Sequence, residues 1–205
     1  MEGILKSKVY VLTDENSRIL RCEGGYTTPA NLEGWTQIDE GTGDRYNLCQ
    51  STYFNGGLYT EDGIPRYKLV DGQPVERTEE EIQADRLPGA KAARIAKSKA
   101  DLADYLASHP LTWTDGNQYS ITQEKQAQLT STLVSSQVDG EPPEWNTTDG
   151  QCREWKLEEL AALGVAIKRR VKALVKYQQG QEIAMNAAAT MEELERVVVD
   201  YDSVV

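Results

Sequence analysis

A pattern that occurs twice, 34 residues apart, constrains the fold of this chain more than any other feature. TWTDGNQYSITQEKQAQL (112–129) and NTTDGQCREWKLEELAAL (146–163) align without gaps and share Thr-Asp-Gly and a final leucine. Asp-Gly tolerates the positive φ angles of a two-residue hairpin turn, and each copy then enters a helix, which Thr122 can cap in the first. The sequence therefore predicts repeated β-hairpin–helix units in 110–205, packed as one small sheet covered by helices.

The helix predicted after the second hairpin is longer than the one after the first. Glu158 and Glu159 in its first turn suit the positive end of the helix dipole. We expect Gly180 to end or loosen this long helix, and Thr190 to begin a last short helix before the tail that contains Tyr201. Three tryptophans near the hairpins are expected to fill the shared core: Trp113, Trp145 and Trp155.

Residues 78–109 are predicted to form a helical connector. Thr78 and Glu81 have the spacing of a capping box that begins a short helix, Pro88-Gly89 interrupts it, and the alanine-rich segment 90–109 is a second helical stretch. Apolar positions of the connector and of the long helix each fall on one face. These positions form the candidate interface: Ile95, Leu102, Leu106, Leu160, Ile167, Val171 and Leu174. The pattern leaves open whether they close an internal core or join copies of the chain in a homo-oligomer.

Residues 1–77 show the period-two alternation of strands, broken by turn sequences. A hairpin is predicted around 14–17, and Asp62-Gly63 and Asp71-Gly72 flank a further strand. Strands joined this tightly predict an antiparallel β-meander domain, so the whole chain is expected to be α+β. The long loop-rich segment between the hairpins contains candidate glycan contacts, for which the alternative role is to pin that loop to the sheet: Tyr26, Trp35 and Tyr46.

Composition and charge argue against several classes of partner. Lys and Arg number 22 against 33 Asp and Glu, and the resulting formal net charge of −11 would repel nucleic acid over most of the surface. Apolar runs are too short for a signal peptide or a membrane span, so we expect no membrane insertion. The three cysteines are widely spaced, which favours reduced thiols over a disulfide framework or a zinc cluster: Cys22, Cys49 and Cys152.

Residues suited to catalysis are scarce. His109 is the one histidine, and it precedes Pro110 at a predicted helix end, where a capping role is expected. The sequence contains no GxSxG elbow, no calcium loop of alternating aspartates and no phosphate loop ending in Lys-Ser/Thr. We therefore expect no enzyme, no cofactor site and no metal site. The basic run in 168–176 is expected to be the solvated back of the long helix, with contact to an acidic partner as the alternative.

The C-terminal half resembles a domain of unassigned biochemical role that recurs in tailed-phage and prophage proteins encoded near tail-fibre genes. The resemblance rests on WNTTDG (145–150), LEEL (157–160), the long helix and AATMEEL (188–194). That domain typically has a capping threonine where this chain has Lys156. The long helix after the second hairpin is therefore expected to begin without a side-chain cap.

The N-terminal part is similar to the leading segment of phage tail-associated proteins. The similarity runs through YVLTDE (10–15), GWTQIDEG (34–41), GDRY (43–46) and YKLVDG (67–72). Together the resemblances imply a virion-associated structural or adaptor protein of a phage or prophage tail, in the region of the tail fibre or baseplate. Such a protein would be made in the bacterial cytoplasm and would act through contacts with other tail proteins. The alternatives are a tail-fibre assembly chaperone and a carbohydrate-binding module for the host surface.

Overall fold

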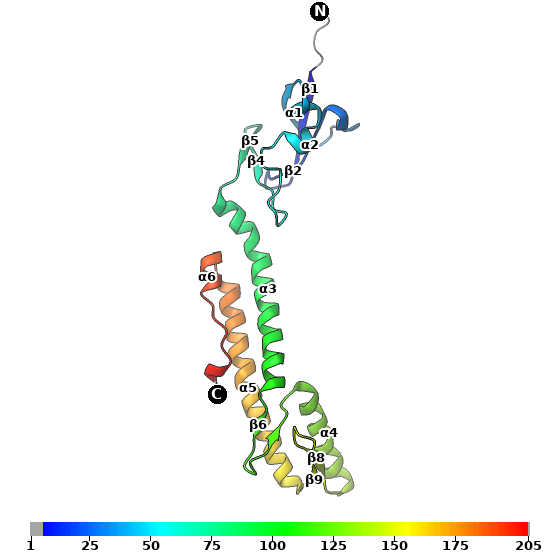
Figure 1. Ribbon diagram of the computed structural model, residues 1–205, viewed down its shortest axis with the longest axis vertical. Helices are drawn as coiled ribbons and strands as arrows, with labels where there is room; N and C mark the ends of the chain where they lie inside the picture. The colour runs from blue at the N-terminus through cyan, green and yellow to red at the C-terminus, as the bar shows by residue number, and fades with distance from the viewer. Residues whose placement is uncertain (1–5, 205) are drawn as a thin grey trace, which may run out of the picture. The chain divides into compact units, whose positions relative to one another are not determined.

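The computed structural model describes residues 6–204 and has the mixed α+β architecture that the sequence predicts (Figure 1). The chain packs into two compact units, Met1–Pro88 and Gly89–Val205. Each unit has a hydrophobic core of its own. No helix within the described residues is both long enough and apolar enough to cross a membrane.

The N-terminal unit contains a three-stranded antiparallel sheet of β1 (Ser7–Thr13), β2 (Ile19–Gly24) and β3 (Trp35–Gly41). Its order is β2-β1-β3, so the antiparallel sheet is confirmed but the predicted meander order is wrong. The long loop after β2 begins with the turn η1 (Gly25–Thr27) and brings β3 to the other edge of β1. The central strand is the most buried, with Val9 and Val11 fully inaccessible to solvent.

The remainder of this unit is a second hairpin and two short helices. β4 (Tyr67–Val70) and β5 (Gln73–Glu76) pair separately from the sheet, across the two-residue turn Asp71-Gly72. Both turn residues have positive φ, 50° and 76°, which makes this the type I′ turn that Asp-Gly favours. The segment expected to be a loop forms α1 (Asp44–Asn47) and α2 (Cys49–Thr52).

Helix α3 (Glu79–Ser108) is continuous through Pro88. The predicted interruption at Pro88-Gly89 is therefore wrong: proline removes one backbone donor from the ladder, and the turns on either side keep the helix intact. The capping box is confirmed. The Glu81 amide donates to Thr78 Oγ1 at 3.3 Å, and the Thr78 amide donates to Glu81 Oε2 at 3.0 Å.

The C-terminal unit alternates hairpins and helices. Hairpin β6 (Leu111–Thr112)/β7 (Gln118–Tyr119) precedes α4 (Gln123–Asp139), and hairpin β8 (Glu144–Asn146)/β9 (Cys152–Glu154) precedes α5 (Leu157–Ala187). The hairpins form two separate two-stranded sheets, so the single sheet expected from the sequence is wrong. One backbone hydrogen bond, from the Thr148 amide to the Gln118 carbonyl at 2.9 Å, joins them.

The two Thr-Asp-Gly turns have the same geometry. The Trp113 amide donates to the Asn117 carbonyl at 2.9 Å, and the Thr147 amide donates to the Gln151 carbonyl at 3.0 Å. These bonds enclose three loop residues, with glycine third at φ 82° and 87°. This is a type I turn closed by a glycine bulge, so the expected two-residue turn is wrong.

The helix ends of the C-terminal unit follow the sequence in most respects. Thr122 caps α4 by accepting from the Lys125 amide, and α5 begins at Lys156 without a side-chain cap. Thr190 caps α6 (Met191–Glu195), as expected. The predicted end of the long helix at Gly180 is wrong, because α5 runs on to Ala187 and the core residue Met185 holds its last turns.

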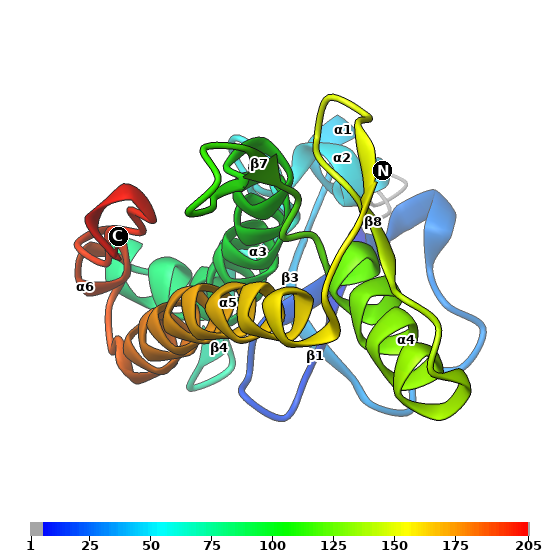
Figure 2. The ribbon, with the colours of Figure 1, turned by 90° about the horizontal axis from the view of Figure 1, so that it is seen from below.

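The core of the C-terminal unit lies between α3, α4, α5 and the hairpins. Figures 1 and 2 show α4 beside the first part of α5, and the C-terminal half of α3 beside α5. Trp145 and Trp155 are buried in this core and Trp113 packs against its edge. After α6 the chain returns along the helices and ends in the turn η2 (Asp202–Val204).

Candidate functional site

The candidate interface residues lie mainly in the core of the C-terminal unit. Leu160 and Leu174 of α5 are fully buried, and Ile167 and Leu106 are nearly so. Leu102 and Val171 are partly buried against the same cluster, and Ile95 is half-buried on α3. The stripe on α5 and the stripe on α3 therefore contribute to one internal core.

The candidate glycan contacts have different surroundings. Tyr26, the central residue of η1, has 81% of its surface exposed. Trp35 is half-buried, with the Arg21 guanidinium 5.4 Å from its ring centroid. Tyr46 packs on Gly41, where a side chain would collide with its ring, and meets Tyr53 edge-on. The loop is thus held by Tyr46, while Tyr26 presents an open aromatic face.

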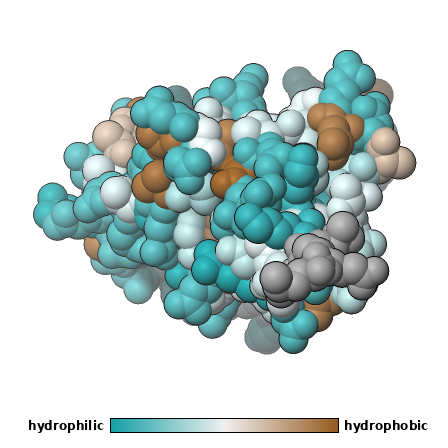
Figure 3. Space-filling model, turned by 90° about the horizontal axis from the view of Figure 1, so that it is seen from above, coloured by the Kyte–Doolittle hydropathy of each residue, from teal (hydrophilic) through white to brown (hydrophobic). Residues whose placement is uncertain are grey.

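Exposed hydrophobic side chains outside these positions are dispersed. On the face drawn in Figure 3, hydrophobic residues lie in small separate groups among hydrophilic ones. In the C-terminal unit the most exposed are Val138 at 83% and Ile183 at 70%. Single apolar residues of this kind are usual on protein surfaces, so contacts that use them also need neighbouring polar groups.

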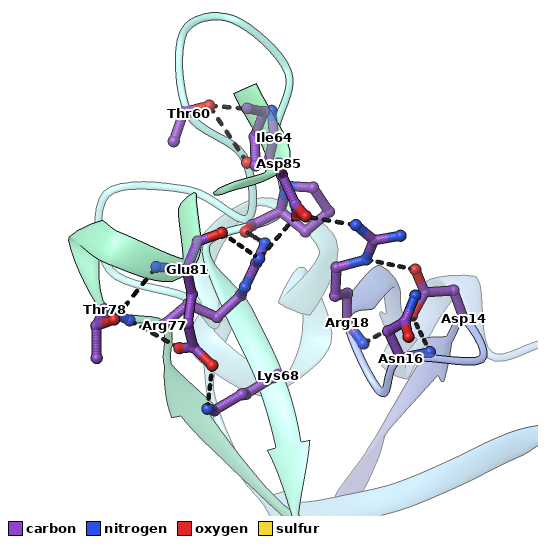
Figure 4. A network of polar contacts seen from close by, with 11 residues as sticks. Asp14, Asn16, Arg18, Thr60, Ile64, Lys68, Arg77, Thr78, Glu81 and Asp85 are labelled. Atoms are coloured by element: carbon purple, nitrogen blue, oxygen red, sulfur yellow. Dashed lines mark hydrogen bonds and ion pairs between the residues drawn. The ribbon is translucent and has the colours of Figure 1, made fainter. Parts of the chain in front are cut away.

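An ion-pair network in the N-terminal unit fastens the first turns of α3 to the β-hairpins (Figure 4). Asp85 of α3 accepts from Arg18 Nη1 at 2.8 Å and from Arg77 Nη2 at 2.7 Å. Arg77 is only 8% exposed and also donates to the carbonyls of Pro65 and Glu81, both at 2.8 Å. This network, which we call the Asp85 network, gives the buried guanidinium of Arg77 three hydrogen-bond acceptors.

The charges in the Asp85 network keep its carboxylates ionised. Burial alone would raise the pKa of Asp85, but hydrogen bonds from Arg18 and Arg77 outweigh it and lower the pKa below the usual range. The pKa of Asp14 is lowered in the same way, with bonds from Arg18 and from the Asn16 amide opposing burial. Carboxylates with a lowered pKa and several hydrogen bonds serve as anchors and are poorly suited to proton transfer near neutral pH.

A second polar cluster joins the two hairpins of the C-terminal unit. Asp115 Oδ2 accepts from Tyr119 Oη at 2.8 Å and from Arg153 Nη2 at 2.9 Å, while Oδ1 accepts from the Asn117 amide. The Arg153 guanidinium also lies 3.6 Å from the Trp155 ring centroid. Burial alone would raise the pKa of Asp115, but these bonds and the charge of Arg153 lower it. We call this cluster the hairpin junction.

The sequence contained a signal for the hairpin junction that periodicity did not use. Tyr119 and Arg153 occupy equivalent positions of the two aligned segments, 34 residues apart. The copies differ there, and in the structure both side chains reach the same aspartate. The change from tyrosine in the first copy to arginine in the second is therefore the sequence feature that corresponds to the contact with Asp115. No comparable pattern pointed to Arg77 or Asp85.

The C-terminal tail is fixed to α3 and α5 by buried polar contacts. Tyr201, 6% exposed, donates from Oη to the Ser98 carbonyl at 2.7 Å. Gln178 of α5 donates from Nε2 to Ser98 Oγ at 3.2 Å, and Tyr177 packs edge-on to Tyr201. The tail thus completes the core of this unit.

The residues considered for chemistry lie in different surroundings. His109 follows α3, stacks on Tyr105 with centroids 4.0 Å apart, and has Nδ1 2.9 Å from Ser108 Oγ. Cys22 and Cys49 are free thiols buried in the N-terminal core, where burial raises the pKa of both, and Cys152 is exposed. Residues 6–204 contain no group of three or more His, Cys, Asp or Glu side chains placed to hold a metal ion.

Comparison with known proteins identifies the family of the C-terminal unit. The model of a family described as a domain of unknown function, DUF4376, matches residues 81–202. No curated protein and no solved structure matches the chain. The match runs from the first turns of α3 through both hairpins to the tail around Tyr201. The chain therefore belongs to the DUF4376 family.

Proposed function

We propose that this protein is a structural adaptor of a phage or prophage tail, in the fibre or baseplate region, and that it acts through protein–protein contacts. The proposal rests on the observation that the protein's buried and partly buried polar side chains hold the fold together. Asp85, Asp115 and Arg77 are each committed to several bonds that hold hairpins and helices together. The resemblance of both halves of the sequence to phage tail-associated proteins supports the location, and the adaptor has no catalytic role.

Quantitative mass spectrometry of purified virions or tail particles tests this proposal. A structural adaptor is expected at a fixed stoichiometry relative to the known tail proteins. Absence from the mature particle, together with presence in assembly intermediates, would favour the tail-fibre assembly chaperone instead.

We assign the attachment to the tail to the N-terminal unit and docking or presentation to the C-terminal unit. The two units have separate cores, and the family match at 81–202 covers almost all of the C-terminal unit but only the last residues of the N-terminal one, which supports a division of roles. Pull-down of tail proteins with the intact chain, and with chains carrying surface substitutions in one unit at a time, tests the assignment. Binding to the baseplate that depends on the C-terminal unit alone would refute it.

The two hairpin–helix units of the C-terminal unit are interpreted as copies of one ancestral unit. The equal hydrogen bonds of the turns at Gly116 and Gly150 support this interpretation. The copies have since diverged in length, since α4 has 17 residues and α5 has 31. Both copies keep the turn aspartate, Asp115 and Asp149, and the second copy has Arg153 where the first has Tyr119.

A carbohydrate-binding role is the second candidate, and the exposure of Tyr26 favours it. A tyrosine ring with 81% of its surface in water is a stacking platform for a sugar face. Glycan-array binding should then disappear with Tyr26→Ala and weaken with Trp35→Ala, while the melting temperature of Tyr26→Ala stays unchanged. Array binding that is absent in the wild type, or unaffected by Tyr26→Ala, excludes this role for the loop.

A further inference from the structure

The outer face of α5 carries a row of lysines. Lys168, Lys172 and Lys176 are four residues apart, so they follow one another along the helix at roughly 6 Å per step. All three are exposed, and none forms an ion pair within residues 6–204. Like charges at this spacing slightly destabilise a helix. The row therefore does not serve the stability of the fold.

Two exposed lysines of α3 in the same unit have acidic partners within the chain. Lys97 pairs with Asp101 of α3 at 2.7 Å, and Lys99 of α3 pairs with Glu182 of α5 at 3.0 Å. In a chain with a formal net charge of −11, acidic side chains are plentiful. The lysine row is therefore a positively charged patch on a chain whose net charge is negative. Such a patch is complementary in charge to an acidic surface of a partner.

A groove of about 500 Å³ between α4 and α5 lies next to the start of the lysine row. Leu129 and Leu133 of α4 line it, and Val165, 57% exposed, and Lys168 line it from α5. Gly164 contributes to its depth, because a Cβ there would lie 3.5 Å from both leucine side chains. The groove thus has an apolar floor, and Lys168, the first lysine of the row, lies at its edge.

We infer that this surface, the α5 docking face (Leu133, Val165, Lys168, Lys172 and Lys176), binds an acidic amphipathic helix of a partner protein. A groove between two packed helices accepts the apolar ridge of a third helix. Glutamates or aspartates four residues apart on that helix match the spacing of the lysines. The identity of the partner as a tail protein rests on the proposed function, whereas its chemistry rests on this face alone.

Three other occupants are less favoured by the observations. Nucleic acid and anionic membranes would meet a basic row on a chain that is acidic elsewhere, so long-range repulsion opposes both. A second copy would have to offer an acidic helix with an apolar ridge. Each of these occupants is an outcome that the following experiment can detect.

Binding of a designed peptide to the full-length protein tests the inference. The probe is a fluorescent 21-residue helix with leucines on one face and glutamates at i, i+4 on its flank. The comparisons are a scrambled peptide of equal composition, the same helix with lysines for glutamates, duplex DNA and vesicles of phosphatidylserine and phosphatidylcholine. The variant is Lys168→Gln/Lys172→Gln/Lys176→Gln. Its control is Gln37→Glu/Thr42→Glu/Gln73→Glu, which changes net charge equally at exposed positions of the N-terminal unit.

The expected result is binding of the acidic helix in preference to every other probe. Three lost charge contacts should weaken it about tenfold in the triple variant, with little change in the control. Val165→Ser, which leaves the charges in place, should weaken binding by roughly threefold through the lost apolar contact. Binding should also weaken as salt is raised.

Several results would overturn the inference. These are equal binding of the scrambled peptide, preferred binding of DNA or vesicles, and self-association that the triple variant abolishes. The inference and the proposed function fail separately. A protein that is present in tail particles but does not bind the acidic helix refutes the docking face alone, and binding by a protein absent from particles refutes the tail location alone.

Discussion

Arg77 exemplifies how single charged residues hold this protein together. Its guanidinium is almost fully buried, yet two carbonyls and Asp85 satisfy its donors. A buried charge is tolerated when its partners are complete, and removing one partner leaves the other uncompensated. Stability at the residue scale therefore depends on networks such as the Asp85 network and the hairpin junction more than on surface ion pairs.

Arg77→Ala should lower the free energy of unfolding by roughly 2–3 kcal/mol, because Pro65 and Glu81 lose a donor while Asp85 keeps only Arg18. Urea denaturation followed by circular dichroism measures the change. Arg86→Ala is the matched control, since it removes the ion pair of Arg86 with the more exposed Asp62. An equal effect of the two substitutions would contradict the role given to burial.

The tail contact predicts an alkaline pH dependence. Burial, with the charges of Asp101 and Tyr177, raises the pKa of Tyr201 to about 12, whereas an ordinary tyrosine has a pKa of about 10. Because the folded state holds this proton more tightly, its contribution to stability is present below pH 10 and is lost as the pH rises toward 12.

Tyr201→Phe removes this titration and the hydrogen bond to the Ser98 carbonyl, at a cost of about 1 kcal/mol at neutral pH. Unfolding free energies of both proteins from pH 8 to pH 12 measure the difference. The gap between wild type and variant should narrow above pH 10. A constant gap would show that the Tyr201 hydroxyl titrates as it would in water.

At the scale of elements, the sequence predicts the caps of the longer helices, including the missing side-chain cap of α5. Thr78, Thr122 and Thr190 each cap a helix, but α5 begins at Lys156 without a side-chain acceptor. A lysine there also places positive charge at the positive end of the helix dipole. The longest helix in the described chain therefore begins without a stabilising side-chain cap.

Lys156→Thr should stabilise the protein by about 1 kcal/mol by supplying the missing acceptor. Thr122→Ala, which removes the existing cap of α4, should destabilise it by a similar amount. Thermal and urea unfolding of the two variants give opposite shifts if the cap interpretation is correct. A destabilised Lys156→Thr would mean that the lysine has a role in the structure beyond the helix start.

Substitution of alanine for a glycine should raise the stability of the protein in helix α5 and lower it in the hairpin turn. A Cβ at Gly180 within α5 would meet nothing within 4 Å, so Gly180→Ala should stabilise by roughly 0.5–1 kcal/mol. Gly150 has φ +87°, so Gly150→Ala should destabilise by roughly 1–2 kcal/mol. Melting temperatures that move in the same direction for both would contradict the assignment of the turn.

Sequence patterns predicted elements better than their arrangement. Thr78 and Glu81 located the start of α3, because a capping box depends on neighbours in the chain. Pro88-Gly89 was expected to interrupt a helix and Gly180 to end or loosen one, but both helices continue through these positions. The start of a helix is determined by local sequence, whereas its length also depends on tertiary packing.

At the scale of the whole molecule, strand order and the polar contacts between elements could not be derived from the periodicity of the sequence. The order β2-β1-β3 depends on which edge of β1 the long loop reaches, and the alternation of Val9 and Val11 is compatible with either edge. The contact of Asp115 with Arg153 joins residues from different hairpins. Long-range choices of this kind arise from the shape of the core, and no period in the sequence encodes them.

The chain as a whole is a DUF4376 domain joined to a β-rich N-terminal unit. The family match covers residues 81–202, and the unit Gly89–Val205 has a core closed by α3, α5, both hairpins and the tail. The proposed adaptor role and the α5 docking face both require that this unit hold a fixed surface. The central claim is therefore that the C-terminal unit is a self-contained fold.

Cooperative unfolding of residues 78–205, expressed without the N-terminal strands, tests this claim most directly. We expect a soluble, helical fragment that unfolds in one two-state transition, and a matched fragment ending before the Tyr201 tail that is markedly less stable. A fragment 78–205 that is unfolded, or that melts gradually without a defined midpoint while the full-length chain melts sharply, would contradict the account.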